Sequence, residues 1–149
     1  MTASHRGENF RRIETRTPQY LRPHDIGRIG EDLAEEYLLG KGYQILARNW
    51  RSSGEVRGEL DIVAQQGHKA VFVEVKTRTT QAFGSPAQAI THRKLQTIVR
   101  LSAKWLQENS SRYTSTRVDA VIIRLHVTPD RRTIVASSVD HIQGISAWR

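Results

Sequence analysis

The stretch from Gly58 to Arg78 constrains the fold most, because it has the pattern of two short strands joined by a polar turn. Residues 59–64 alternate between two faces with the period of a half-buried strand. Residues 70–78 are rich in β-branched and aromatic side chains, which favour strands. The pattern therefore predicts a β-hairpin at the centre of the domain.

The turn fixes the register of this hairpin. A two-residue turn at Gly67-His68 and a four-residue loop around it give the same pairing. In that pairing Asp61 lies opposite Glu74, and Glu59 lies opposite Lys76. Cross-strand neighbours on one face have Cβ atoms about 4.5–5.5 Å apart. The sequence therefore brings two carboxylates and an ammonium group to one small patch.

Such a patch suits metal-assisted cleavage of a phosphodiester bond. Asp61 and Glu74 offer hard oxygen ligands to a Mg²⁺ ion, and Lys76 projects from the same face to orient or deprotonate a water. The alternative is a cross-strand salt bridge on a solvated face. Like charges opposite each other are destabilising unless a cation lies between them, which favours the metal site.

Three segments carry a family resemblance: residues 27–38 (GRIGEDLAEEYL), 58–64 (GELDIVA) and 72–78 (FVEVKTR). Together and in this order they resemble the YraN-like family of small, uncharacterised bacterial proteins. The spacing of Asp61 to Glu74-Val75-Lys76 is similar to the core of the PD-(D/E)XK nuclease superfamily. The YraN-like family is regarded as restriction-endonuclease-like and is compared with archaeal Holliday-junction resolvases. The resemblance covers residues 26–148.

The resemblance implies an α/β fold with a restriction-endonuclease-like core, a mixed central sheet of about five strands flanked by helices. It implies that Glu31 is a helix-borne acid that reaches the metal site. The implied activity is Mg²⁺-dependent hydrolysis of DNA phosphodiester bonds, on branched or structured DNA, with Mn²⁺ able to replace Mg²⁺. By analogy with the resolvases, a homodimer is a candidate assembly.

The charge of the chain points to the same class of partner. A formal net charge of +8 favours a polyanion, most simply nucleic acid, with DNA expected. Arg78 is expected to hold a phosphate, the loop residues Arg51 and Arg57 to follow a substrate backbone, and Lys94 to contact a phosphate near a helix start. A non-catalytic nucleic-acid-binding module that retains the nuclease fold explains the charge equally well. An RNA substrate would use the same site.

Length and composition set the domain organisation. The 149 residues suffice for one domain, which we place at 26–149, after a basic and disordered arm at 1–25. The chain has no cysteine, which excludes disulfides, thiolate metal sites and a cysteine nucleophile. No apolar run approaches the length of a membrane span, so a cytoplasmic location is expected.

Periodicity and capping signals predict the remaining elements. Asp119 interrupts the strand at 117–125, and we expect it to be hydrogen-bonded there and to lie outside the metal site. The predicted elements are a helix over 26–41 capped by Asp25, a strand over 42–50, a long helix from Ser85-Pro86 to Glu108, strands over 117–125 and 133–137, and a short helix over 139–148.

Overall fold

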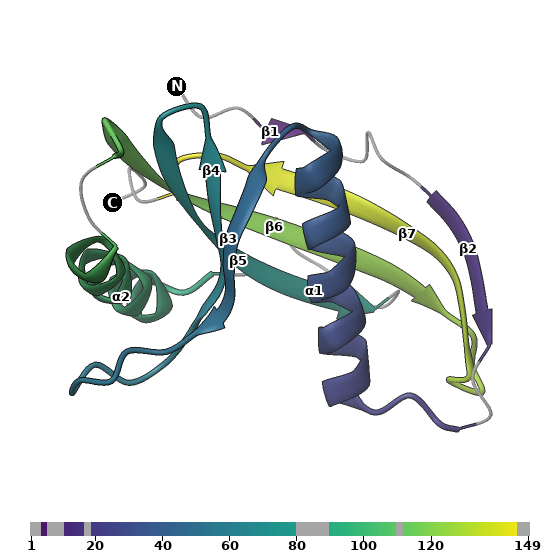
Figure 1. Cartoon of the computed structure of the whole chain (residues 1–149). Helices are drawn as coiled ribbons and strands as arrows, with labels where there is room; N and C mark the ends of the chain where they lie inside the picture. Colours follow the sequence, from purple (N-terminus) through teal and green to yellow (C-terminus); the bar gives the residue numbers. More distant parts are fainter. Residues whose placement is uncertain (1–3, 6–10, 17–18, 80–89, 110–111, 146–149) are drawn as a thin grey trace.

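The computed structural model describes residues 4–5, 11–16, 19–79, 90–109 and 112–145. In these residues one mixed β-sheet has helix α1 on one face and helix α2 on the other (Figure 1). None of the described helices is long and apolar enough to span a membrane. The elements in chain order are β1 Ser4–His5, β2 Arg11–Arg16, α1 Pro23–Gly40, β3 Gln44–Trp50, β4 Leu60–Gln66, β5 Lys69–Thr79, α2 His92–Glu108, β6 Ser115–Val127 and β7 Thr133–Ile142.

The strand order in the sheet is β1-β7-β6-β5-β4-β3, with β2 also paired to β7. Strands β5 and β6 are parallel, and α2 lies in the crossover between them. The remaining pairs are antiparallel. The predicted hairpin register is confirmed from Gln66 and Lys69 at the turn to Ile62 and Val73. The nuclease-like α/β core implied by the resemblance is also confirmed.

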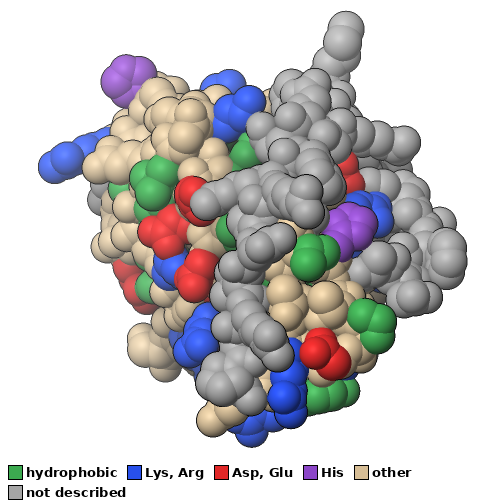
Figure 2. Space-filling view, turned by 90° about the vertical axis from the view of Figure 1, so that its right-hand side faces the viewer, with side chains coloured by type: hydrophobic (Ala, Val, Ile, Leu, Met, Phe, Trp, Pro, Cys, Tyr) green, Lys and Arg blue, Asp and Glu red, His purple; other side chains and the backbone are tan. Residues whose placement is uncertain are grey.

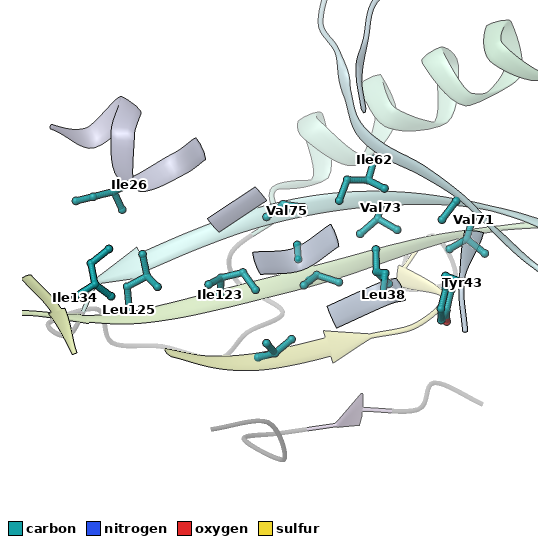
Figure 3. Close-up of a cluster of buried hydrophobic side chains, with 14 of the residues drawn as sticks. Ile26, Leu38, Tyr43, Ile62, Val71, Val73, Val75, Ile123, Leu125 and Ile134 are labelled. Atoms are coloured by element: carbon teal, nitrogen blue, oxygen red, sulfur yellow. The ribbon is translucent and has the colours of Figure 1, made fainter. Parts of the chain in front are cut away.

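Alternate residues of β5 and β6 build a core on each face, as the period of two requires. Toward α1, the side chains of both strands pack with Ile26, Ala34 and Leu38, and Figure 3 shows much of this cluster. Toward α2, Phe72 and Ile122 pack with the apolar stripe of that helix. The stripe consists of Leu95, Ile98, Leu101 and Trp105.

Helix α1 approaches β5 most closely at Gly30. A Cβ atom added to Gly30 would lie 1.8 Å from Thr77 Oγ1, so only glycine allows this contact. The sequence suggests merely that this glycine weakens the helix. In the structure it lets the next residue, Glu31, lie beside the carboxyl end of β5.

Both predicted helix starts are wrong. Helix α1 begins at Pro23, and Asp25 lies inside its first turn, where its Oδ2 accepts a hydrogen bond from the Arg22 N–H at 3.0 Å. Helix α2 begins at His92, because Thr91 Oγ1 accepts from the Lys94 N–H at 3.1 Å and caps it. A continuous helix from Ser85-Pro86 is therefore excluded, although that dipeptide lies outside the described residues.

The predicted C-terminal helix over 139–148 is also wrong for its first part. Strand β7 continues to Ile142, with Val139 paired to Ile123 and Ile142 to Ala120 of β6. The three-residue spacing of Ile142 and Ile145 suggested a helix. The segment up to Ile142 is instead extended because it pairs with β6. Residues 146–149 lie outside the described part of the chain.

The N-terminal arm differs from a wholly disordered segment where the structure describes it. Ser4–His5 and Arg11–Arg16 pair antiparallel with β7. The exposed backbone groups of an edge strand bind another strand whatever its side chains are. Apolar periodicity, which this arm lacks, therefore could not predict the pairing.

Candidate metal centre

Strands β4 and β5 separate at the point where the two central acids lie. The last paired residues are Ile62 and Val73. Beyond them the Val75 N–H donates to Asp61 Oδ2 at 2.8 Å in place of a backbone partner. Figure 1 shows β3 and β4 leading away from β5 there. The Asp61 and Glu74 residues are only 7% and 8% exposed.

The carboxyl groups of Asp61 and Glu74 lie on the same side of the sheet, close enough to share a hydrogen bond. Glu31 approaches Asp61 from α1. The ligand oxygens of Glu31, Glu59 and Asp61 all lie within 4.8 Å of one another. Four acids from three parts of the chain thus meet at the end of the β4–β5 ladder.

Glu59 was not among the candidate ligands, because the register extended past Asp61 placed it opposite Lys76. The ladder stops before Glu59, and its Oε2 instead pairs with Arg51 Nη2 at 3.1 Å. The sequence nevertheless contains a signal that Glu59 belongs to the site. Glu59 precedes Asp61 by two residues, which in an extended chain places both side chains on one face.

The electrostatics of the cluster favour a cation. Burial and the charge of Asp61 raise the pKa of Glu74 to about 8. Burial also raises the pKa of Asp61, more than the hydrogen bond from Val75 lowers it. For Glu31, burial and then repulsion by Asp61 raise the pKa against the opposing effect of Arg48. Glu74 Oε2 is buried and has no hydrogen-bond partner among the described residues.

These donors fit a hard divalent ion. Mg²⁺ and Mn²⁺ sites use carboxylate oxygens, and opposite ligands of one Mg²⁺ lie about 4.2 Å apart at the usual Mg–O distance. The oxygens of Glu31, Glu59 and Asp61 lie within 4.8 Å of one another, which is compatible with this separation. Glu74 lies beside Asp61, and its partnerless oxygen is a further candidate donor. Small side-chain movements would bring these oxygens onto one ion or two neighbouring ions.

The cation nearest to the central acids is Lys94, in the first turn of α2. Its Nζ lies 3.6 Å from Glu74 Oε1, and within the described residues this is the only ion pair of either Asp61 or Glu74. The sequence suggests a phosphate contact for Lys94, without indicating that it would reach the acids. Lys76 is exposed and lines a cavity that it shares with Glu31.

The arginines expected to bind nucleic acid surround this centre less closely. Arg51 is paired with Glu59, and Arg57 is exposed in the same loop. Arg78 is partly buried near the end of β5. Their role as phosphate ligands remains a prediction.

Arg48 of β3 was missed as a neighbour of the site. Its guanidinium contacts Asp32 at 2.8 Å and Glu35 at 2.7 Å, and lies 3.6 Å from Glu31. Asp32 and Glu35 therefore join α1 to β3 through this arginine. Figure 2 shows a face on which acidic and basic side chains are interspersed and not segregated.

Asp119 lies outside the cluster, as predicted. It is fully buried, and both its oxygens have partners. Arg117 donates two hydrogen bonds to it, at 2.8 and 2.9 Å, His141 lies 2.8 Å away, and the Gly144 N–H donates at 3.1 Å. Burial would raise the pKa of Asp119, but these partners together lower it. No acceptor remains there for a metal.

Comparison with known proteins places these residues in a family. Residues 30–123 match the model of Uncharacterised protein family UPF0102, a range that includes every acid of the cluster. A UPF0102 protein of Mycolicibacterium vanbaalenii is 43% identical over 122 residues, which cover 82% of this chain and 93% of that protein. One of Beutenbergia cavernae is 40% identical over 120 residues, covering 80% and 94%. One of Mycolicibacterium gilvum is 46% identical over 102 residues, covering 67% and 80%.

Proposed function

Because the chain belongs to the Uncharacterised protein family UPF0102, we propose its function from the chemistry of its own site: a metal-dependent endonuclease that hydrolyses nucleic-acid phosphodiester bonds, with DNA as the expected substrate. The observation that carries the proposal is the meeting of Glu31, Glu59 and Asp61, with Glu74 beside Asp61 and one buried Glu74 oxygen without a hydrogen-bond partner among the described residues. A protein gains nothing in stability from such an arrangement unless a cation joins it.

Each acid has a distinct part in the proposal. Asp61 and Glu74, buried and fixed on strands, would hold the ion, with Glu31 and Glu59 completing its oxygen ligands. Bound Mg²⁺ or Mn²⁺ would supply Lewis acidity and an activated water. Asp61 is already oriented by the Val75 N–H. This pre-organisation lowers the cost of collecting like charges around a ligand.

The two lysines would act on the substrate side. Lys76 is exposed beside Glu31 and is free to orient the attacking water or to balance charge on the phosphate. Lys94 pairs with Glu74 and would keep the acids together before an ion enters. The positive end of α2 lies in the same region and would favour a phosphate there. The net charge of +8 supports a polyanionic substrate.

The test compares Asp61→Asn with Glu108→Gln, an acid-to-amide change at an exposed residue of α2. We expect the wild type and Glu108→Gln to bind Mn²⁺ in calorimetry and to cut linear, flapped or four-way DNA. Asp61→Asn should lose both properties, and Lys76→Ala should lose cutting while it still binds Mn²⁺.

Two outcomes reject the proposal. If the wild type takes up no Mn²⁺ or Mg²⁺ but binds DNA, the chain is a binding module that retains the nuclease fold. If residual cutting is equal in the wild type, Asp61→Asn and Lys76→Ala, the nuclease activity comes from a contaminant and not from this centre. Repeating the assay with RNA of the same sequence identifies the sugar preference.

A further inference from the structure

A cavity of about 430 Å³ adjoins the acid cluster. The first turns of α1 form one wall, the end of β5 forms another, and Arg131 of the β6–β7 turn closes it. Glu31 belongs to both the cavity and the cluster, so a molecule in the cavity would lie next to the metal ligands. The lining residues are Pro23, Ile26, Gly27, Glu31, Val75, Lys76, Thr77, Thr79 and Arg131.

The polar part of this lining suits a phosphate. Lys76 and Arg131 bring two positive charges, and Thr77 and Thr79 bring two hydroxyl groups that can donate hydrogen bonds. The start of α1 adds the positive end of a long helix. Among the described residues of the lining, the only acid is Glu31, which the proposed metal would neutralise.

Arg131 closes the β-turn over 128–131 and has the left-handed backbone conformation that commonly follows such a turn in a hairpin. Its φ of +56° lies in the left-handed region, which costs a residue with a side chain about 1–2 kcal/mol. Its N–H donates to the Thr128 carbonyl at 2.8 Å, and its own carbonyl accepts from the Leu21 N–H at 2.9 Å. Its Nε is buried with no hydrogen-bond partner in the described residues. Its Nη2 donates to the Leu21 carbonyl at 3.4 Å, so a ligand in the cavity would bind the Nη groups and not the buried Nε.

An exposed aromatic ring lies beside this arginine. The Arg131 guanidinium carbon is 5.3 Å from the centre of the Tyr20 ring, and Tyr20 is 56% exposed. Aromatic rings exposed next to a positive groove are platforms on which unpaired bases stack. A paired base has both of its faces covered by its neighbours in the duplex and is not available to such a ring.

We propose that this cavity and the Tyr20 ring outside it, next to Arg131, form a nucleotide subsite: Lys76 and Arg131 in the cavity bind a phosphate of the cut strand, and an unpaired base stacks on Tyr20. The inference rests on the proposed nuclease function and refines it, because it names a strand with an unpaired nucleotide beside the cut as the preferred substrate. The volume is within the range of small-molecule sites and exceeds the need of a phosphate alone.

The alternative is that Tyr20 and Arg131 only fasten the chain before α1 to the β6–β7 turn. The two roles give different results with Tyr20→Phe and Tyr20→Ala. Both variants lose the hydroxyl, but only alanine loses the ring that would stack. Arg132→Gln is the matched control for Arg131→Gln, because Arg132 is an exposed neighbour in the same turn and does not line the cavity.

The experiment measures binding of the full chain to a short fluorescein-labelled oligothymidylate, and to a fully paired duplex of equal length, with Ca²⁺ present. Tyr20→Ala and Arg131→Gln should each weaken single-strand binding by about 5- to 150-fold and duplex binding by less than about 3-fold. Tyr20→Phe and Arg132→Gln should leave both affinities unchanged. Thermal melting of each variant confirms that it is folded. If Arg131→Gln does not fold, the two Tyr20 variants decide.

Equal losses on both probes, no loss with Tyr20→Ala, or no binding of the oligothymidylate by the wild type would overturn the subsite. The proposed function fails in a different way. If the wild type binds the single strand in a Tyr20-dependent manner but never cuts with Mn²⁺, the subsite proposal stands and the nuclease proposal is rejected. If the wild type cuts and Tyr20→Ala leaves the binding affinity unchanged, the nuclease proposal stands and the subsite proposal is rejected.

Discussion

Replacement of Glu74 by glutamine should remove most of the pH dependence of stability between pH 5 and pH 8 in the metal-free protein. In the folded chain, burial and the charge of Asp61 raise the pKa of Glu74 from 4.5 to about 8. In the unfolded chain the same group ionises near its ordinary value. Between these two pH values the folded state therefore holds a proton that the unfolded state has released.

Proton linkage gives the sign and the size of the effect of Glu74 on stability. Where the folded state binds more protons, stability falls as the pH rises, by up to about 1.4 kcal/mol per pH unit for one group. The contribution of Glu74 is thus complete below about pH 4.5 and is lost as the pH passes about 8. The raised pKa of Asp61 acts in the same direction. The lowered pKa of Asp119 acts only in more acidic solution and does not disturb this window.

Urea unfolding at several pH values in EDTA measures this slope. Glu74→Gln keeps the shape of the protonated side chain and cannot ionise, so its stability should change little from pH 5 to pH 8. Glu55→Gln, an exposed change in the β3–β4 loop, should behave like the wild type. Equal slopes in Glu74→Gln and the wild type would refute the claim that a buried, protonated acid pair lies at this centre.

Three further changes probe the neighbouring contacts. Lys94→Gln should strengthen Mn²⁺ binding about 5-fold or more in calorimetry, because it removes a cation 3.6 Å from Glu74. The control Lys104→Gln on the same helix should leave the affinity unchanged. An unchanged Mn²⁺ affinity in both variants would refute the contact between Lys94 and Glu74. Gly30→Ala should cost about 1–3 kcal/mol in urea unfolding and weaken Mn²⁺ binding, because its Cβ would displace α1 from β5, and a wild-type melting curve would contradict the close packing. Asp119→Asn should cost about 3–5 kcal/mol and leave the Mn²⁺ affinity of the folded fraction unchanged, because it breaks a buried ion pair outside the cluster.

The part of the site that local rules control could be predicted from the sequence. The turn at Gly67-His68 fixes the register, and with it the convergence of Asp61 and Glu74. Contacts that depend on how distant elements pack could not be predicted. Lys94 reaches Glu74 only because α2 starts at His92 and lies over that face of the sheet. Glu59 joins the acids because β4 leaves β5, and no alternation pattern reports where a ladder ends.

The same limit explains the errors at the two ends of the chain. Strand β7 binds β6 on one side and the N-terminal strands β1 and β2 on the other. Each of these segments has a weak pattern of its own, and the backbone partner supplies what the side chains do not specify. A segment whose conformation is decided by an edge is therefore the kind that single-sequence reasoning assigns wrongly.

Two buried acids on neighbouring strands differ in a way that supports the proposed metal site. Asp119 on β6 and Glu74 on β5 are both excluded from water. Asp119 receives donors for both its oxygens, and its pKa falls. Glu74 faces another acid, keeps an oxygen without a partner, and its pKa rises. The fold can thus satisfy a buried carboxylate completely where the role is structural. The charge of Glu74 is compensated by a proton, by the Lys94 ammonium or by a bound cation. This asymmetry supports placing the proposed ion at the β4–β5 junction and not at Asp119.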